Sequence, residues 1–209
     1  MSIINELKLD FKKDKVKSFF MNNMGAITAL VLFVFVLFFS IMFVNAYKNS
    51  KIKNYSGKIF LALNSVDKVG ELEKIYGDDG APRISKTFAG MKLVEEYKNS
   101  NNFSKVEDIY GEIFENEKEI FFKNYAGLNL LSMEINKDKM NIDKINKLFS
   151  KLENVKNPLY DMVLEQKIIF LMRQDKKDEA KTLVGGLLRK NSNSKNMQDR
   201  LNKYLDILK

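Results

Sequence analysis

The sequence predicts an all-α chain in which one N-terminal transmembrane helix precedes a solenoid of about three helical hairpins, flanked by a leading helix and a capping helix. Residues 24–44 contain no charged side chain. Beyond them, apolar residues recur at steps of three and four, the period of one helix face. A short motif also returns after 37 residues, which is typical of stacked repeats. The chain therefore divides into a basic head (1–23), a transmembrane helix (24–44) and a helical domain (45–209).

The first 44 residues have the organisation of a membrane anchor. The 21 uncharged residues 24–44 would cross a hydrocarbon core of about 30 Å, because a helix rises about 1.5 Å per residue. Five lysines and the pair Phe19 and Phe20 precede them, as in cytoplasmic segments that contact anionic lipid headgroups. Four lysines follow closely, so the lysine count slightly favours a cytoplasmic N-terminus. The alternative for the head is a disordered basic segment.

A cleaved signal peptide is a second interpretation of the same stretch. Residues 44–46 place small side chains where a signal peptidase acts, so cleavage after Ala46 would release an exported domain. The apolar run exceeds the about 7 to 15 residues of a signal peptide, which favours an uncleaved anchor. Either interpretation exports the domain that follows.

A leading helix is predicted over residues 52–76. Its apolar side chains share one face: Ile52, Tyr55, Ile59, Ala62, Val66, Val69, Leu72 and Tyr76. The glycines and proline of residues 77–82 predict the turn that ends it. We expect this face to pack within the domain, and the alternative is a coiled-coil dimer seam, which has the same spacing.

The repeat begins after this turn. The motif Phe88-Ala89-Gly90 is echoed by Tyr125, Ala126 and Gly127, and both copies are predicted to be helices. Because Ala and Gly have small or absent side chains, each pair lets a neighbouring helix approach closely. The predicted packing positions of the hairpins are Ala89, Gly90, Ala126 and Gly127, together with Ala180 in a later copy.

Each first helix is followed by a polar turn and a second amphipathic helix. The apolar positions of the second helices align in three sets: Val106, Tyr110 and Ile113; Ile145, Phe149 and Leu152; Ala180, Val184 and Leu187. Successive sets are 39 and 35 residues apart, close to the tetratricopeptide period of about 34. A third first helix is predicted over residues 162–172.

A capping helix and an unusual glycine pair complete the domain. Residues 197–208 carry the apolar spacing of a closing helix that covers the last hairpin. Gly185 and Gly186 lie inside a predicted helix, where each glycine costs about 1 kcal/mol in helix propensity. We expect a close helix contact or a bend at this pair.

The composition excludes several kinds of chemistry. The chain has no Cys, His or Trp, so it lacks disulfides, imidazole bases and the commonest zinc ligands. Phosphate-binding and nucleophile-elbow motifs are also missing. The acid pairs at 78–79 and 95–96 are expected to be solvated. We therefore expect no enzyme, cofactor or metal site. We expect no nucleic-acid binding either, because the lysines behind the net charge of +8 are interspersed with acids.

A protein-binding surface is the function that this pattern favours. In a solenoid of hairpins the first helices line a concave groove. The helical register places Glu95, Asn99, Ser132 and Asn136 beside the packed stripe, where they would face the groove. These four residues are the candidate partner site.

The chain resembles the ancillary Sec translocon subunit family. Residues 16–25 (VKSFFMNNMG) are similar to the charged stretch, paired aromatics and glycine that precede the span in that family. The Ala-Gly first helices and residues 176–181 (KKDEAK) are similar to its repeats. Two features depart from the family pattern. Val106 and Ile145 stand where a small residue is usual, and tryptophan is missing near the membrane.

The resemblance implies a location and a set of partners. It implies a single-pass protein of the bacterial inner membrane with a cytoplasmic N-terminus and a tetratricopeptide-like domain in the periplasm. That domain would assist protein export as a scaffold that binds translocon subunits, exported chaperones or their clients. The alternatives are an envelope-organising or cell-division-coordinating protein that self-associates through the face of residues 52–69, and a cleaved, exported binding domain.

Overall fold

A computed structural model describes residues 24–154, 156–189 and 195–208. The side chains of residues 24–34 and of residue 37 are outside this description. The predictions for the head, residues 1–23, therefore lie outside the described residues.

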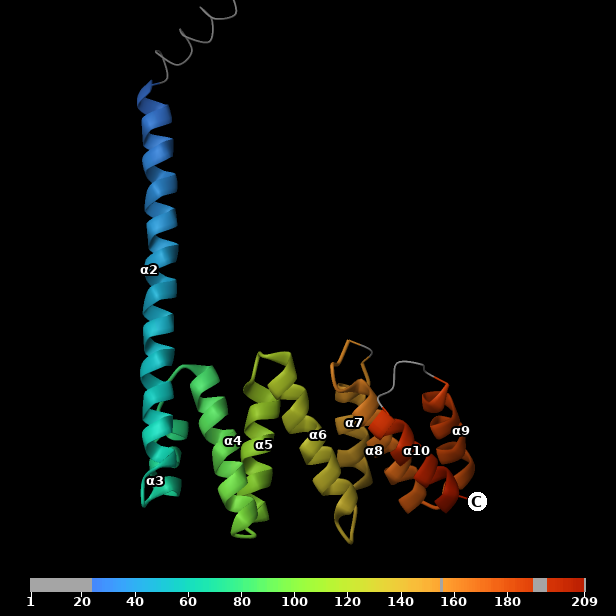
Figure 1. Ribbon diagram of the computed structural model, residues 1–209. Helices are drawn as coiled ribbons and strands as arrows, with labels where there is room; N and C mark the ends of the chain where they lie inside the picture. Colours follow the sequence, from blue (N-terminus) through green and yellow to red (C-terminus); the bar gives the residue numbers. More distant parts are fainter. Residues whose placement is uncertain (1–23, 155, 190–194, 209) are drawn as a thin grey trace, which may run out of the picture. The chain divides into compact units, whose positions relative to one another are not determined.

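The described part of the chain is all-α, with helices packed in sequential pairs (Figure 1). The helices are α2 (Met24–Leu63), α3 (Lys68–Gly77), α4 (Arg83–Asn99), α5 (Phe103–Asn116), α6 (Ile120–Asn136), α7 (Ile142–Leu152), α8 (Tyr160–Arg173), α9 (Lys177–Leu188) and α10 (Lys195–Ile207). The all-α prediction is confirmed.

The chain forms two compact units, and the first ends at Asn54. Its described part is residues 24–54 of the long helix α2, which expose large apolar side chains from Phe35 to Val44. In the described part of the chain, no helix combines the length and the apolar character that crossing a membrane requires. The side chains of residues 24–34 are not described, so the span predicted over residues 24–44 stays a prediction.

The single leading helix predicted over residues 52–76 is wrong, because the chain breaks it into the end of α2 and the separate helix α3. The carboxylate of Asp67 caps α3 by accepting the backbone N–H of Gly70 at 3.0 Å. This cap stabilises a new helix start, and a turn in front of it leaves Val66 fully exposed. Tyr55 and Ala62 nevertheless lie in the core of the second unit, as an internal packing face requires.

Three hairpins follow, α4 with α5, α6 with α7 and α8 with α9 (Figure 1). The first and third use the same turn. Asn101 and Asp175 have φ values of 56° and 58°. The next N–H groups, on Asn102 and Lys176, donate 2.8 and 2.9 Å bonds to carbonyl groups five residues back. This left-handed ending satisfies the last carbonyl groups of α4 and α8, as expected of repeated units.

The Ala-Gly pairs lie where neighbouring helices come closest. Ala89, Ala126 and Ala180 are fully buried. A Cβ atom at Gly90 would lie 2.7 Å from the ring of Tyr76 in the preceding helix. At Gly127 it would lie 2.5 Å from the ring of Phe114. In both repeats the glycine therefore makes room for an aromatic ring of the helix before it.

The buried apolar side chains form two clusters that meet in α8. The larger extends from the end of α2 to Val163 and Phe170 of α8. The smaller joins the other face of α8, including Ile168, to α9 and α10. The third hairpin and the capping helix thus share a core of their own.

The close helix contact expected at Gly185 and Gly186 is not found among the described residues. Helix α9 continues through both glycines. A Cβ atom at either position would meet nothing within 4 Å among the side chains and neighbouring backbone of the described residues. Packing among the described residues therefore does not require glycine at these positions.

Alanine substitutions should separate the two kinds of glycine. Gly127→Ala should lower the free energy of unfolding by about 1 to 3 kcal/mol, because the methyl group would overlap a buried ring. Gly185→Ala should raise it by up to about 1 kcal/mol, because the methyl group enters open space and improves helix propensity. Thermal unfolding followed by circular dichroism measures both changes, and equal effects at the two sites would refute this distinction.

Candidate functional site

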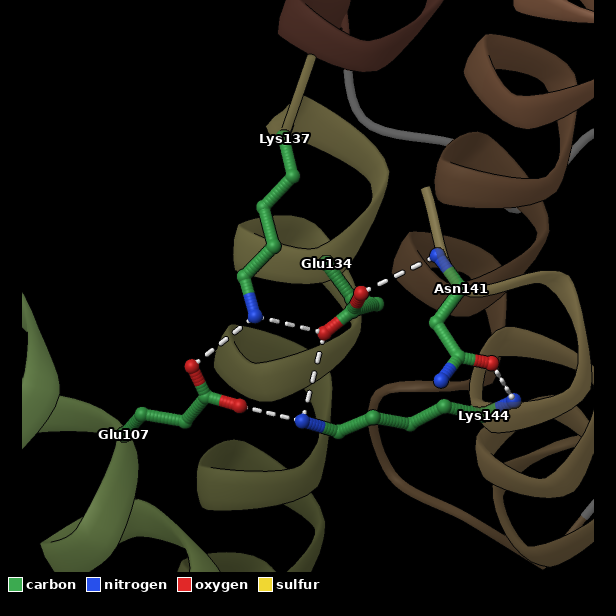
Figure 2. Close-up of polar contacts among 5 residues, drawn as sticks. All are labelled: Glu107, Glu134, Lys137, Asn141 and Lys144. Atoms are coloured by element: carbon green, nitrogen blue, oxygen red, sulfur yellow. Dashed lines mark hydrogen bonds and ion pairs between the residues drawn. The ribbon is translucent and has the colours of Figure 1, made fainter. Parts of the chain in front are cut away.

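A cluster of four charged side chains joins the first two hairpins (Figure 2). Glu134 of α6 is almost fully buried, and it accepts bonds from Lys137 Nζ at 2.8 Å and the Asn141 N–H at 3.1 Å. Lys144 of α7 lies 3.2 Å from the same carboxylate. Glu107 of α5 contacts Lys137 at 3.0 Å and also pairs with Lys144. The cluster therefore connects α5, α6 and α7.

Two carboxylates and two ammonium groups make this cluster neutral. Hydrogen bonding to Lys144 holds the pKa of Glu107 below its usual value. Burial favours the protonated form of Glu134, but the bonds from Lys137, Asn141 and Lys144 outweigh it and lower the pKa of Glu134. The two glutamates are thus charged at neutral pH, and their charges are balanced locally.

An equivalent cluster joins α3, α4 and α5. Lys105 Nζ lies 2.7 Å from Glu73 and 3.0 Å from the Tyr97 hydroxyl, which itself donates to Glu73. Matching positions in the two clusters are counted from the first fully buried residue of each helix. That residue is Leu72 in α3, Val106 in α5 and Ile145 in α7. In the first cluster Glu73 directly follows Leu72, and Lys105 directly precedes Val106. In the second, Glu107 directly follows Val106, and Lys144 directly precedes Ile145. We call the two clusters the first bridge (Glu73, Tyr97, Lys105) and the second bridge (Glu107, Glu134, Lys144).

Two more buried carboxylates tie distant helices together. Glu117 accepts bonds from Arg83 Nε at 3.1 Å, from the Thr87 hydroxyl and from two backbone N–H groups ahead of α6. Glu165 of α8 pairs through both oxygens with Arg200 of α10, at 2.6 and 2.9 Å. The capping helix is therefore fastened to α8 by a two-point ion pair as well as by its apolar face.

An exposed aromatic surface lies on the two first helices α4 and α6. Phe88 and Phe121 are each 48% exposed, and Tyr125 is 38% exposed. The ring of Phe122 lies 5.4 Å from that of Phe88 and 5.6 Å from that of Phe121. Phe121 stacks on Tyr125 at 6.3 Å. We call these four residues the aromatic patch.

The four predicted groove residues lie on α4 (Glu95 and Asn99) and α6 (Ser132 and Asn136). Glu95 is exposed and pairs with Lys92 of its own helix at 2.9 Å. Asn99 and Asn136 are exposed at the ends of α4 and α6. Asn136 donates to the carbonyl group of Ser132 at 2.8 Å, which is a contact within one turn. That carbonyl contact joins Ser132 to Asn136, while Glu95 is held on its own helix.

The sequence reasoning did not single out the bridges or the aromatic patch. The patch could have been found from the aromatic residues beside the Ala-Gly pairs, Phe88 and Tyr125. The bridges had no local signal, because Glu73 and Glu107 each pair with side chains 24 to 37 residues away.

The chemistry of these sites is that of ion pairing and apolar contact. In the described ranges, no group of three or more acidic, His or Cys side chains is placed to hold a metal ion. Carboxylates saturated by lysine and backbone N–H groups hold helices in register. The exposed rings offer apolar area that another protein could cover.

These features define a helical protein of stacked hairpins with an exposed aromatic surface. Over residues 1–207 the chain matches the family described as "Protein of unknown function (DUF2659)", and it belongs to that family. No curated protein and no solved structure matches the chain significantly.

The second bridge should make stability depend on pH in the acid range. The folded pKa values of Glu107 and Glu134 lie below the unfolded value of 4.5. Their contribution to stability is therefore complete above about pH 4.5 and lost as the pH falls through the folded values. At pH 7, Glu107→Gln should cost about 1 kcal/mol, and this cost should shrink in acid.

Glu115→Gln is the matched control. Glu115 pairs with Lys151 at 2.7 Å, but its side chain is 61% exposed. An exposed pair contributes little, so this change should stay within about 0.5 kcal/mol at pH 7. Denaturant unfolding at pH 7 and pH 3.5 measures both variants. A Glu107→Gln cost that is the same at both pH values would contradict the assignment.

Proposed function

We propose that this protein is a scaffold that binds other proteins and is tethered to a membrane by its N-terminal segment. The aromatic patch is the observation that carries the proposal. Exposed phenylalanine and tyrosine rings are enriched at protein interfaces, where they bury a large area at small entropic cost. In this chain the rings of two successive hairpins touch, so they present one surface rather than scattered side chains.

The repeated architecture supports a scaffold of the tetratricopeptide-like kind. The first two hairpins have equivalent glycine contacts, the first and third have equivalent turns, and equivalent bridges lie at the first two junctions. Stacked helical hairpins of this kind commonly serve as extended recognition surfaces. We therefore assign the second unit to an α-solenoid of three hairpins with α10 as its cap.

The membrane tether rests on the sequence and on the apolar surface of α2. Residues 24–44 carry no charge. In the described part of this stretch, large apolar side chains are exposed at successive positions: Phe35, Val36, Phe38, Phe39, Ile41, Met42, Phe43 and Val44. Successive helical residues point in different directions, so this surface surrounds the helix, as in a helix bathed in lipid. Resistance of the full chain to carbonate extraction tests the tether, and release into the soluble fraction would contradict it.

The resemblance to the ancillary Sec translocon subunits supplies the first partners to test. On that proposal the protein lies in a bacterial inner membrane with its helical domain in the periplasm. There it would bind translocon subunits, exported chaperones or clients. Self-association through residues 52–69 receives less support, since Tyr55 and Ala62 are already buried in the core of the second unit.

Photocrosslinking from the aromatic patch should capture protein partners in membranes. A photoreactive phenylalanine analogue at position 88 should give crosslinked bands that mass spectrometry identifies. Phe121→Ser in the same chain should reduce their yield at least about fivefold, because it removes a contact ring 48% exposed to solvent.

Phe103→Ser is the matched control. Phe103 is 53% exposed at the start of α5 and is outside the patch. This variant should leave the yield unchanged, and both variants should keep the helical circular dichroism of the wild type. Equal losses in the two variants would contradict the patch. Recovery of the chain itself as the partner would support self-association instead.

A further inference from the structure

The third hairpin meets the second across an open cleft. One cavity of about 890 Å³ is lined by residues of α7, α8 and α9 and by the turn between α8 and α9. A second, of about 670 Å³, continues between α8 and α9. Lys167, Leu171 and Glu179 line both. We call the combined space the α8 cleft. Its apolar lining includes Phe149, Phe170, Leu164, Leu171, Leu183 and Leu187.

The cleft lies where a third bridge would have formed. Ala180 is the fully buried residue of α9 that matches Val106 and Ile145. The residue before it, where a bridge has its lysine, is Glu179. The residue after Ile145, where a bridge has its glutamate, is Asn146. The first-helix position of Tyr97 and Glu134 is taken by Leu171. Asn146 carries no charge, and Glu179 has the sign opposite to Lys105 and Lys144. All three residues line the cleft.

The packing of α8 agrees with this difference. Helices α3 and α4 pack extensively against each other, as do α5 and α6. Helix α8 packs against α7 at few positions and more extensively against α6. Arg173 of α8 donates to the carbonyl group of Ile135 at the end of α6. The surface of α8 and α9 that faces α7 is therefore left partly uncovered.

The glycine pair of α9 is a second, independent feature of this cleft. Gly186 lines it, and a Cβ atom there would meet nothing within 4 Å among the described residues. Gly90 and Gly127 are explained by rings inside the domain, whereas Gly186 has no such internal contact. Because Gly186 has no side chain, it leaves room at the cleft for the backbone of another helix to approach α9 closely.

The charges of the lining indicate what that occupant carries. Three carboxylates, on Glu153, Asp178 and Glu179, face the cleft with two ammonium groups, on Lys167 and Lys176. Lys167 is held by Glu153 at 2.7 Å, while Lys176 lies 3.6 Å from Glu179. Asp178 and Glu179 are therefore the acidic side chains that α9 contributes to the cleft. They are acidic although the chain as a whole has a net charge of +8.

We propose that the α8 cleft binds an amphipathic helix of a partner protein, with a lysine or arginine of that helix paired with Glu179. The partner's apolar face covers Leu164, Leu171 and Leu183, and its backbone approaches α9 at Gly186. Its basic side chain supplies the positive charge that Lys105 and Lys144 supply at the first two junctions. This inference rests on the proposed function as a protein scaffold, but it names a site separate from the aromatic patch.

A synthetic helix tests the cleft with the full chain in phosphatidylcholine nanodiscs. The probe is a fluorescent 16-residue helix of leucine on one face and lysine on the other, and empty nanodiscs give the background. Anisotropy should show saturable binding. A probe with glutamate in place of lysine should bind at least about fivefold more weakly, because it meets Asp178 and Glu179. Equal binding of the two probes, or no binding, would overturn the inference.

Three variants locate the binding. Gly186→Leu should weaken it at least about tenfold by filling the cleft, while Gly111→Leu, at an open glycine of α5 outside the cleft, should leave it unchanged. The double change Asn146→Glu and Glu179→Lys rebuilds a bridge and should weaken binding at least about fivefold. Circular dichroism verifies that each variant folds.

The aromatic patch variant separates the two proposals. Binding that persists in Phe121→Ser but is lost in Gly186→Leu supports the cleft. Binding lost in Phe121→Ser and kept in Gly186→Leu would overturn the cleft and leave the proposed scaffold function in place. Probe binding by the wild-type chain, together with an absence of photocrosslinks from its aromatic patch, would overturn the patch and leave the cleft in place.

Discussion

Each hairpin of this protein buries its apolar stripe only by stacking on its neighbours, so the closeness of helix packing is the constraint on which the fold depends. Gly90 and Gly127 set that closeness at the first two repeats, where rings of Tyr76 and Phe114 occupy the space that a side chain would need. The buried alanines beside them add no bulk. With larger residues, the helices would separate and the continuous core from α2 to α8 would be interrupted.

Buried charge then determines which helices can be neighbours. A buried carboxylate is costly unless it is paired, so Glu134, Glu117 and Glu165 favour only arrangements that bring their lysine or arginine partners into place. The two bridges have the same arrangement of residues with one difference: the first-helix position is Tyr97 in the first bridge and Glu134 in the second. Lys137 supplies the additional positive charge that the second glutamate requires. The bridges thus add specificity to a core whose apolar residues alone could tolerate several alignments.

The sequence was sufficient for the helices and their pairing, because apolar period and the Ala-Gly motif are local signals. It was insufficient at residues 64–67, where the apolar spacing continues through Val66 although Asp67 and Gly70 start a new helix. It also treated Asp78 and Glu96 as solvated surface acids. In the structure Asp78 accepts the Tyr55 hydroxyl at 2.5 Å, and Glu96 pairs with Lys68 at 3.1 Å. Such contacts depend on how helices stack, which a spacing rule within one helix does not contain.

The third hairpin differs from the first two in its polar contacts and in its core. Its turn and its buried stripe follow the repeat, but Asn146, Leu171 and Glu179 replace the bridge. Its helix α9 shares a core with α10, and among the buried residues of α8 only Val163 and Phe170 join the core that includes α7. Hydrogen exchange of the full chain, measured by mass spectrometry, is the sharpest test of whether the third hairpin and α10 open as a separate unit. We expect α8, α9 and α10 to exchange together and faster than α4 to α7, as a unit that opens at the α8 cleft. Uniform exchange of all seven helices in one cooperative step would contradict it.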